Sequence, residues 1–540
     1  MAYNTAGRIR ELGLTHEQLA RGLELATKPR TVVTSAGKTK TLDPQVVIDG
    51  DRVALAETRS AEAQLAREVA RLTRAPSRPL AIPADLWGTF VPHEHQTAAI
   101  ELLTRARVMV LTGGPGTGKT TLVQKARDVL AAGGGQILQV APTGKAAVRL
   151  EQQTGCPAAT VHRALGWTGT TWLHHAGNPL PYNTLIIDEA SMVDVRLAAV
   201  LLSAVKTGAR VLFVGDVDQL PSISCGRVLH DLIASGVLPV ARLTKIFRQA
   251  SESRIPYVAK DVNEGRVPEN LAGEGTDVRF VEKLYEEETI ALIVGAVAKY
   301  LPEQKGFAPR DIQVLCAQRS KRDDEGGLGI GVERFNFELQ FALNPTRTGE
   351  RDVPLGGGYQ VRKGDRTIHT KNNYDLAVMN GEMGWVLGAD AQGLDLDMFP
   401  DVTTSEDAAK NGAYDDDGDE DDDGDEDDVT APATRRKATY VLVIQYDGRA
   451  PVAYNVNEAR ELLLGYCVTV HKSQGSQFPA VILALPQAHQ WMLARALVYT
   501  AVTRAERYCL MVGQAAVLAK AVKNTRGTER RTQLQTFLQA

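Results

Sequence analysis

The chain has 540 residues, of which 44% are hydrophobic and 23% charged, an ordinary composition for a globular protein long enough for about three or four domains. Its five cysteines include no C-x-x-C pair, which argues against a zinc site or a disulfide framework and fits a reducing cytoplasm. No apolar run approaches the roughly 20 residues that cross a bilayer, and the first residues lack the apolar segment of a signal peptide. We therefore expect a cytoplasmic protein without membrane attachment.

The net charge of −4 hides an uneven distribution. Residues 415–428 read DDDGDEDDDGDEDD and hold twelve carboxylates, so the rest of the chain carries a net charge of +8. Such a run cannot bury apolar surface and repels itself, which predicts a disordered acidic loop over about 403–436. Two interpretations stay open: a solvated spacer, or an electrostatic mimic of DNA that competes for a basic channel.

The first 88 residues predict a small helical accessory domain. Residues 15–26 (THEQLARGLELA) open with capping-box spacing, and residues 60–72 carry apolar side chains at helical spacing. Three prolines between 76 and 83 then indicate a linker.

From residue 89 to 240, apolar strands alternate with helices, which is the pattern of a parallel sheet covered on both faces. A second set of the same kind covers 241–354 and 461–540. Residues 355–460, between these two parts, are rich in strand formers and contain the acidic run. The sequence therefore predicts an α/β protein with two α/β domains, the second interrupted by a small inserted β-barrel.

Residues 108–125 read VMVLTGGPGTGKTTLVQK, in which an apolar strand leads into G-x-x-x-x-G-K-[ST] and then into a helix. In such a loop the glycines let backbone N–H groups surround phosphates, Lys119 neutralises charge, and the hydroxyl of Thr120 suits Mg²⁺. A chance match in a surface turn is the alternative, but the strand and the helix supply the required context. The residues expected to bind a nucleoside triphosphate are Gly114, Pro115, Gly116, Thr117, Gly118, Lys119, Thr120 and Thr121.

Two carboxylates end the apolar strand in LIIDEAS, as in a Walker B element. We expect Asp188 to hold Mg²⁺ and Glu189 to orient and polarise the attacking water. Gln219, in GDVDQLPS after the next strand, is placed to contact the γ-phosphate. Arg248 and Arg504 lie in the second α/β domain and would reach the phosphates across a cleft, as arginine fingers do. The alternatives are a surface Asp-Glu pair and surface arginines in salt bridges.

Eight segments in order resemble the helicase motifs of superfamily 1, and ATVHRALGW followed by NPLPYNTLIIDEASMVD is similar to the RecD-like branch. The resemblance covers roughly residues 90–515 and implies two RecA-like domains, ATP-driven movement along single-stranded DNA, and 5′ to 3′ polarity. It also implies that Gln96 reads adenine, although a lone glutamine on a helix is more often solvated. Many relatives carry Glu where Gln477 stands here. The segments are GGPGTGKTT, APTGKAA, ATVHRAL, LIIDEASMVD, GDVDQLPS, LTKIFRQ, VTVHKSQGSQF and LVYTAVTRA.

The same resemblance implies which residues line the path of the DNA strand. They are short polar and basic groups, which can bind phosphates without reading bases. Asn372 and Asn373, in KNNYD, are weaker candidates because each could instead be a turn or capping residue. The residues within the motifs are Thr143, Lys145, Thr160, His162, Thr469, His471 and Lys472.

Residues 166–180 combine strand formers with turn residues and hold no catalytic candidate. Their position matches the β-hairpin that RecD-like helicases project as a strand-separating pin. Trp172 or His174 could then stack on the terminal base pair. An ordinary surface loop or hairpin is the alternative.

The motifs, together with what the resemblance implies, predict an ATP-dependent, Mg²⁺-dependent 5′ to 3′ DNA helicase. It would act on single-stranded DNA and on duplexes with a 5′ tail, alone or with replication or repair proteins. An RNA helicase of the same superfamily is one alternative. A P-loop switch or kinase would leave the motifs of the second domain unexplained, and a scaffold with a decayed ATPase would not keep every catalytic position filled.

Overall fold

The computed structural model describes residues 52–247, 253–271, 276–320, 327–373, 378–405, 439–526 and 529–540, together with Leu376 and short stretches between 21 and 49. Arg248 and the acidic run 415–428 lie outside the described residues, so the expectations for them stay predictions.

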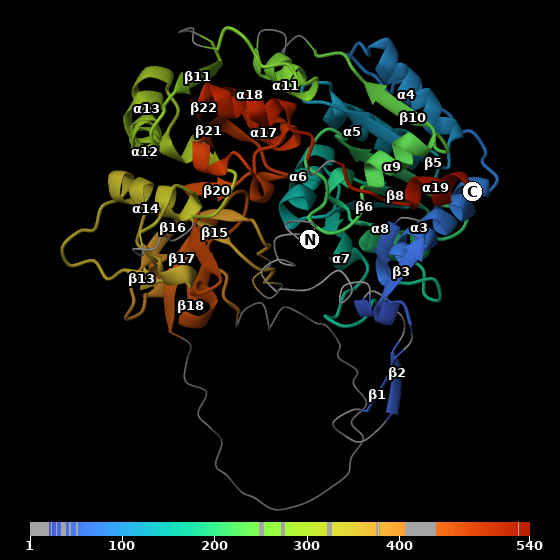
Figure 1. Ribbon diagram of the computed structural model, residues 1–540, viewed down its shortest axis with the longest axis horizontal. Helices are drawn as coiled ribbons and strands as arrows, with labels where there is room; N and C mark the ends of the chain where they lie inside the picture. The colour runs from blue at the N-terminus through green and yellow to red at the C-terminus, as the bar shows by residue number, and fades with distance from the viewer. Residues whose placement is uncertain are drawn as a thin grey trace, which may run out of the picture.

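The first α/β domain, which we call the first motor domain after the resemblance to helicases, is built on a six-stranded parallel sheet with the strand order β10-β5-β9-β8-β6-β7 (Figure 1). The strands β8 and β9 are buried along their whole length, because helices cover both faces of the sheet. The strands are β5 (Val108–Gly113), β6 (Ile137–Ala141), β7 (Ala158–Thr160), β8 (Thr184–Ile187), β9 (Arg210–Gly215) and β10 (Val240–Leu243). The helices are α4 (Glu94–Arg105), α5 (Lys119–Ala132), α6 (Gly144–Thr154), α7 (Val161–Ala164), η1 (Ala190–Met192), α8 (Val195–Ser203) and α9 (Val228–Ser235).

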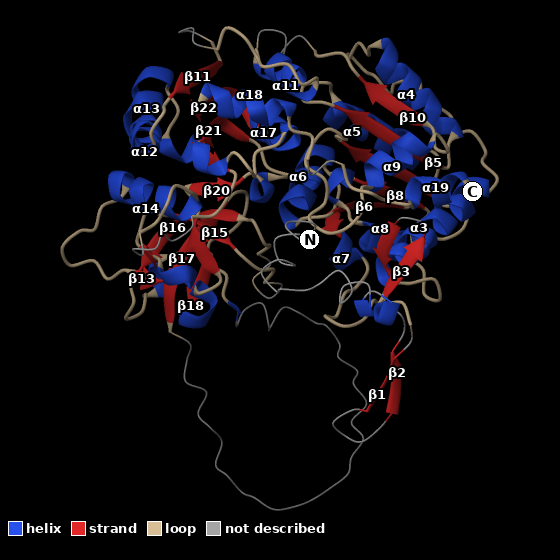
Figure 2. Ribbon diagram, viewed as in Figure 1, coloured by secondary structure: helices blue, strands red, loops and turns tan. Residues whose placement is uncertain are grey.

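The second motor domain has a five-stranded parallel sheet with the order β11-β22-β21-β12-β20. Figure 2 shows helices packed around it, as in the first domain. Its strands are β11 (Val278–Glu282), β12 (Ile312–Cys316), β20 (Cys467–Thr469), β21 (Phe478–Leu485) and β22 (Ala505–Gly513). Its helices are α11 (Ile255–Asn263), α12 (Glu286–Gly295), η2 (Ala296–Tyr300), α13 (Leu301–Lys305), η3 (Pro309–Asp311), α14 (Val332–Leu343), η6 (His471–Ser473), η7 (Gln487–His489), α17 (Arg495–Val502) and α18 (Ala515–Lys523).

The segment inserted into the second motor domain forms an antiparallel sheet rather than the expected barrel. Its described strands pair in the order β18-β17-β16-β15-β19, without a pairing of β18 with β19 that would close a barrel, and Thr403 bridges Val452 on the other edge of β18. Because β19 pairs with β15, the inserted sheet extends past residue 460, where we expected the insertion to end. The elements are β13 (Val353–Pro354), η4 (Gly356–Gly358), β14 (Gln360–Val361), β15 (Arg366–His369), β16 (Met383–Ala389), η5 (Leu396–Met398), β17 (Tyr440–Tyr446), β18 (Val452–Asn455), α16 (Val456–Ala459) and β19 (Leu462–Leu464).

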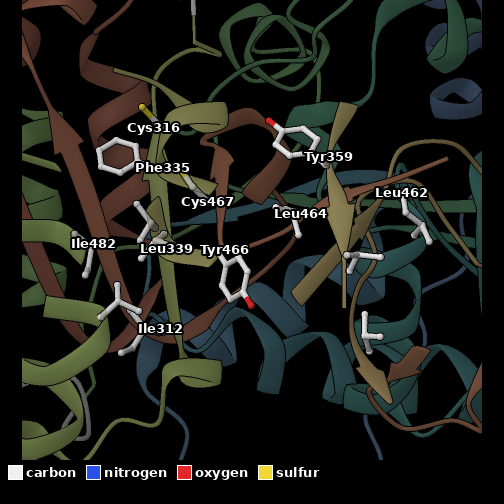
Figure 3. Close-up of a cluster of buried hydrophobic side chains, with 14 of the residues drawn as sticks. Ile312, Cys316, Phe335, Leu339, Tyr359, Leu462, Leu464, Tyr466, Cys467 and Ile482 are labelled. Atoms are coloured by element: carbon white, nitrogen blue, oxygen red, sulfur yellow. The ribbon is translucent and has the colours of Figure 1, made fainter. Parts of the chain in front are cut away.

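The inserted sheet shares one hydrophobic core with the second motor domain (Figure 3). Phe335 and Leu339 of α14 pack in the same cluster as Leu464 of the inserted sheet and Ile482 of the motor sheet, and all four are almost fully buried. The insertion therefore moves with the second motor domain rather than as a separately packed body.

The N-terminal region contains strands as well as the expected helices. Residues 21–22 and 24–26, the described part of the helix expected over 15–26, are helical, and residues 15–20 lie outside the described residues. The strands form two antiparallel pairs, β1 (Arg30–Val33) with β2 (Thr39–Leu42) and β3 (Val46–Asp49) with β4 (Arg52–Leu55). The helix expected near residues 60–72 is present as α3 (Ala56–Arg74). Its apolar face packs against α8, so α3 belongs to the core of the first motor domain.

The end of the chain returns to the first motor domain. The helix α19 (Leu534–Gln539) packs against α3 and α9, and Leu534 is buried in their shared core. Just before it, the guanidinium of Arg530 donates to the carbonyls of Ser222 and Gly226. The division that placed 461–540 wholly in the second motor domain is therefore wrong for this last segment. No helix in the described ranges has the length and apolar character of a membrane span.

Candidate nucleotide cleft and nucleic-acid interface

The phosphate-gripping loop connects β5 to α5. Gly116 and Gly118 have φ angles of 70° and 76°, a left-handed backbone that favours glycine, and this turns the chain sharply into the helix. Within the loop, the hydroxyl of Thr117 donates to the carbonyl of Gly114 over 2.8 Å. The ammonium of Lys119 donates to the same carbonyl over 2.8 Å, which places its charge inside the loop where phosphates bind.

A cavity of about 590 Å³ opens at this loop, within the usual range for small-molecule sites. It brings together residues far apart in the sequence and from both motor domains, including every described residue that we expected to take part in nucleotide binding and hydrolysis. Its lining includes Gln96, the eight residues 114–121, Arg149, Asp188, Glu189, Asp216, Gln219, Phe247, Gln477, Thr503 and Arg504.

The two expected carboxylates follow β8 directly. Burial, and then the negative charge of Glu189, raise the pKa of Asp188 to about 6. A bound divalent cation would favour the ionised form, and Thr120 lines the same cavity, so the donor set fits Mg²⁺. Glu189 has a φ of 48°, a left-handed conformation that is costly for a non-glycine residue and is concentrated at functional sites.

Gln219 is 8% exposed and its amide nitrogen donates to Asp216 over 3.2 Å. A carboxylate only accepts hydrogen bonds, so this contact fixes which way the amide of Gln219 faces. Its oxygen is buried without a hydrogen-bond partner among the described residues. Gln219 lines the cavity, and its second N–H can still donate, so contact with the γ-phosphate or with a water molecule stays a prediction.

The second motor domain contributes Arg504, which is 2% exposed and donates to the carbonyls of Ser476 and Thr500. Sequence reasoning missed Arg149 of α6, which lines the cavity from the first domain. Arg149 donates to Gln477 over 2.6 Å and so joins the two domains across the cleft. The pairing depends on the tertiary fold, and the only signal in the sequence was that Arg149 lies two residues after the motif segment APTGKAA.

Gln96 is buried rather than solvated, with 1% of its surface exposed. Its side-chain oxygen accepts from the backbone N–H of His93 and completes a capping box at the start of α4. Phe247, which the sequence did not single out, docks beside it through a hydrogen bond from its N–H to the carbonyl of Gly116. Both side chains line the cavity and lie beside Gly118 of the phosphate loop, and adenine recognition by Gln96 stays a prediction.

Three threonines that we expected on the DNA path have structural roles. Thr143, Thr160 and Thr469 each accept a hydrogen bond from the backbone N–H three residues later, at 3.3, 3.1 and 3.3 Å. Thr143 and Thr160 are therefore the N-caps of α6 and α7, whereas Thr469 lies two residues before η6, whose N-cap is Val470. Contact with DNA through the same hydroxyl stays a prediction.

The basic candidates divide into exposed and covered groups. Lys472 is exposed, whereas His162 and His471 are half-buried, and burial lowers the pKa of each histidine, which favours the neutral ring. Lys145 lies 5.0 Å above the ring of Phe478 at the boundary between the motor domains. Burial lowers the pKa of Lys145 to about 8. Contact of this partly buried lysine with a DNA phosphate stays a prediction.

Asn372 and Asn373 close a turn, which is the alternative that we left open for them. The side-chain oxygen of Asn372 accepts from the N–H of Asn380, and that of Asn373 accepts from the N–H of Leu376. The same turn carries Met379, whose side chain lies directly against Gly144 of the first motor domain.

The segment 166–180 forms two isolated antiparallel bridges, Trp167 with Trp172 and His175 with Asn178, and no extended hairpin. Trp172 is half-buried between His162 and Trp167, with ring centroids 5.5 and 4.2 Å away, so it anchors the segment instead of offering a free ring. His174 is also half-buried. The exposed apolar side chains are Trp167 and Leu173, at 37% and 58%.

Two family models match the motor. The AAA domain matches residues 92–282, and the UvrD-like helicase C-terminal domain matches residues 464–512. The RecD subunit of the RecBCD enzyme from Mycolicibacterium smegmatis is 30% identical over 467 residues, which cover 80% of this chain and 72% of that subunit. This chain belongs to the RecD-like family of ATP-dependent DNA helicases.

A second relative of this RecD-like chain is the ATP-dependent RecD2 DNA helicase of Deinococcus radiodurans, which is 33% identical over 422 residues. The match covers 78% of the RecD-like chain but about half, 49%, of the relative. Among solved structures, the Pif1 helicase of Candida albicans has a TM-score of 0.46 at 16% identity, covering 81% of the RecD-like chain and 98% of the Pif1 chain.

Proposed function

We propose that this chain hydrolyses ATP to move 5′ to 3′ along single-stranded DNA and to unwind duplexes that carry a 5′ single-stranded tail. The observation that carries the proposal is the shared cleft, in which the phosphate loop and two carboxylates of one motor domain face Arg504 of the other. Hydrolysis in such a cleft changes the distance between domains, and that change can move a strand bound across both.

Each described side chain has a defined task in this proposal. Lys119 neutralises phosphate charge, and Thr120 with Asp188 would hold Mg²⁺, which stabilises charge on the transferred phosphoryl group. Glu189 polarises the attacking water, and the free oxygen of Gln219 accepts a second hydrogen bond from it. Arg504 neutralises charge on the transferred group when the cleft is closed.

The partner of the motor is single-stranded nucleic acid, bound mainly through its backbone. Lys472 is exposed on η6, directly after β20, and is the described motif residue best placed to neutralise a phosphate. Replication or repair proteins could load the motor. RecD relatives that are named subunits of the RecBCD enzyme support a role beside other DNA-processing proteins.

The proposal is tested by measuring ATP hydrolysis with increasing single-stranded DNA and, in parallel, with RNA of the same sequence. The helicase proposal expects strong stimulation by DNA. Stimulation by RNA alone would indicate an RNA helicase, and a rate indifferent to both polymers would indicate a P-loop switch.

We also propose that residues 166–180 separate the strands at the fork. An obstacle must contact the duplex junction, and the exposed side chains of Trp167 and Leu173 are available for that contact, while Trp172 fixes the segment to the domain. A pin acts after translocation, so its loss should uncouple movement from unwinding.

Replacing residues 168–176 by a short Gly-Ser turn should preserve DNA-stimulated ATP hydrolysis and translocation but eliminate unwinding. Translocation is measured as displacement of streptavidin from biotinylated single-stranded DNA, beside duplex unwinding. The single substitution Leu173→Ala removes the more exposed apolar side chain and leaves the contacts of Trp172 with His162 and Trp167 intact, so it separates lost fork contact from local misfolding. Normal unwinding by both variants would show that this segment is not the pin.

A further inference from the structure

Tyr499 connects the second motor domain to the hydrolytic centre of the first. It lies on α17, five residues before Arg504, and is 3% exposed. Its hydroxyl donates to Asp216 over 2.8 Å, and Asp216 directly follows β9 of the first motor domain. This buried hydrogen bond therefore crosses the boundary between the two domains.

Asp216 links Tyr499 to Gln219 because it accepts hydrogen bonds from both side chains. One carboxylate oxygen, Oδ2, accepts from both Tyr499 and the amide nitrogen of Gln219. The amide is held with its oxygen facing away from Asp216, and that oxygen has no hydrogen-bond partner among the described residues. The orientation of Gln219 in the cleft thus depends on a carboxylate that the second domain holds from the other side.

Further contacts secure the same loop. The backbone N–H of Leu220 donates to the hydroxyl of Thr500 over 2.9 Å, and its carbonyl accepts from Gln474 of the second domain over 2.9 Å. The hydroxyl of Tyr499 also lies close to the phosphate loop. If Gly114 were alanine, its Cβ would lie 3.2 Å from the hydroxyl oxygen of Tyr499. Movement of α17 would shift Tyr499 and Arg504 together.

We propose that Tyr499 is a positioning residue that couples the state of the second motor domain to hydrolysis by orienting Gln219 through Asp216. This inference rests on the proposed DNA-driven ATPase and deepens it. When DNA changes the position of the second domain, the hydrogen bond to Asp216 forms or breaks, and the acceptor of Gln219 turns toward or away from the attacking water.

The test is Tyr499→Phe, which removes one hydroxyl and keeps the ring. The kcat of ATP hydrolysis at saturating single-stranded DNA should fall about tenfold, while the KM for ATP stays within about twofold, because the hydroxyl acts on water orientation rather than on nucleotide binding. In a Gln219→Ala background, Tyr499→Phe should have no further effect, since the residue through which it acts is gone.

Tyr466→Phe is the matched control, because Tyr466 is also buried in the second domain and donates to a carboxylate, Asp365, over 2.8 Å, away from the cleft. Its kcat and KM should equal those of the wild type. A Tyr499→Phe protein with wild-type kcat, or additive losses in the double variant, would overturn the relay. Failure of the underlying function would be visible separately, as a wild-type protein whose ATP hydrolysis does not respond to DNA.

Discussion

Replacing Glu189 by glutamine is expected to slow ATP hydrolysis by about 10²–10⁴-fold, the usual contribution of a general base, while ATP affinity stays close to that of the wild type. Glutamine keeps the size and the hydrogen-bonding capacity of the side chain but cannot take a proton from the attacking water. Removing the negative charge next to Asp188 also relieves the repulsion that contributes to its raised pKa. Single-turnover hydrolysis and titration with a fluorescent ATP analogue measure the two quantities.

Lys119→Ala is the matched comparison, since both residues line the same cavity but have different tasks. Loss of the ammonium should weaken ATP binding because nothing replaces its charge at the phosphates. Equal losses of ATP affinity in the two variants would contradict the separate roles assigned to them.

Arg504→Ala should have the other large effect, a fall of about 10³–10⁵-fold in DNA-stimulated hydrolysis, as measured for arginine fingers elsewhere. Its guanidinium lines the cleft from the second domain, and no other described arginine does so. Arg504→Lys retains a positive charge without the planar fork and should recover only part of the rate. Retained ATP binding in Arg504→Ala would show that the cleft is still formed, and a normal hydrolysis rate in that variant would exclude the finger.

The sequence predicted the parts of the site that depend on local chain geometry. The glycines before Lys119 indicate a tight turn between a strand and a helix, and Asp188 and Glu189 directly follow a buried strand. Both features are therefore recognisable from a short segment of the sequence. The parallel sheets were predictable for the same reason, because their strands read as continuous apolar runs.

The unpredicted parts depend on contacts between distant segments. Nothing near Arg149 or Tyr499 indicates that their partners are Gln477 and Asp216, 328 and 283 residues away. The return of α19 to the first motor domain is equally non-local. The strand pairs near the N-terminus were missed because each is only four residues per strand, too short for a clear alternation of apolar and polar side chains.

The DNA candidates show that residue type does not settle a role. Threonine and asparagine are common both in phosphate contacts and in caps and turns, and the structure shows the second role for Thr143, Thr160 and Asn372. Lys145 and Trp172 were expected to face the nucleic acid. A lysine stem and an indole ring can also be stabilised by packing against apolar surface. In the structure Lys145 packs against Phe478 and Trp172 packs against Trp167.

The most direct measurement of the central claim compares unwinding of two duplexes that are identical except for a 5′ or a 3′ single-stranded tail, with ATP and Mg²⁺ present. Our account predicts strand separation of the 5′-tailed duplex, no separation of the 3′-tailed duplex, and loss of activity in Glu189→Gln. Preferential unwinding of the 3′-tailed duplex, or equal activity in Glu189→Gln, would contradict it.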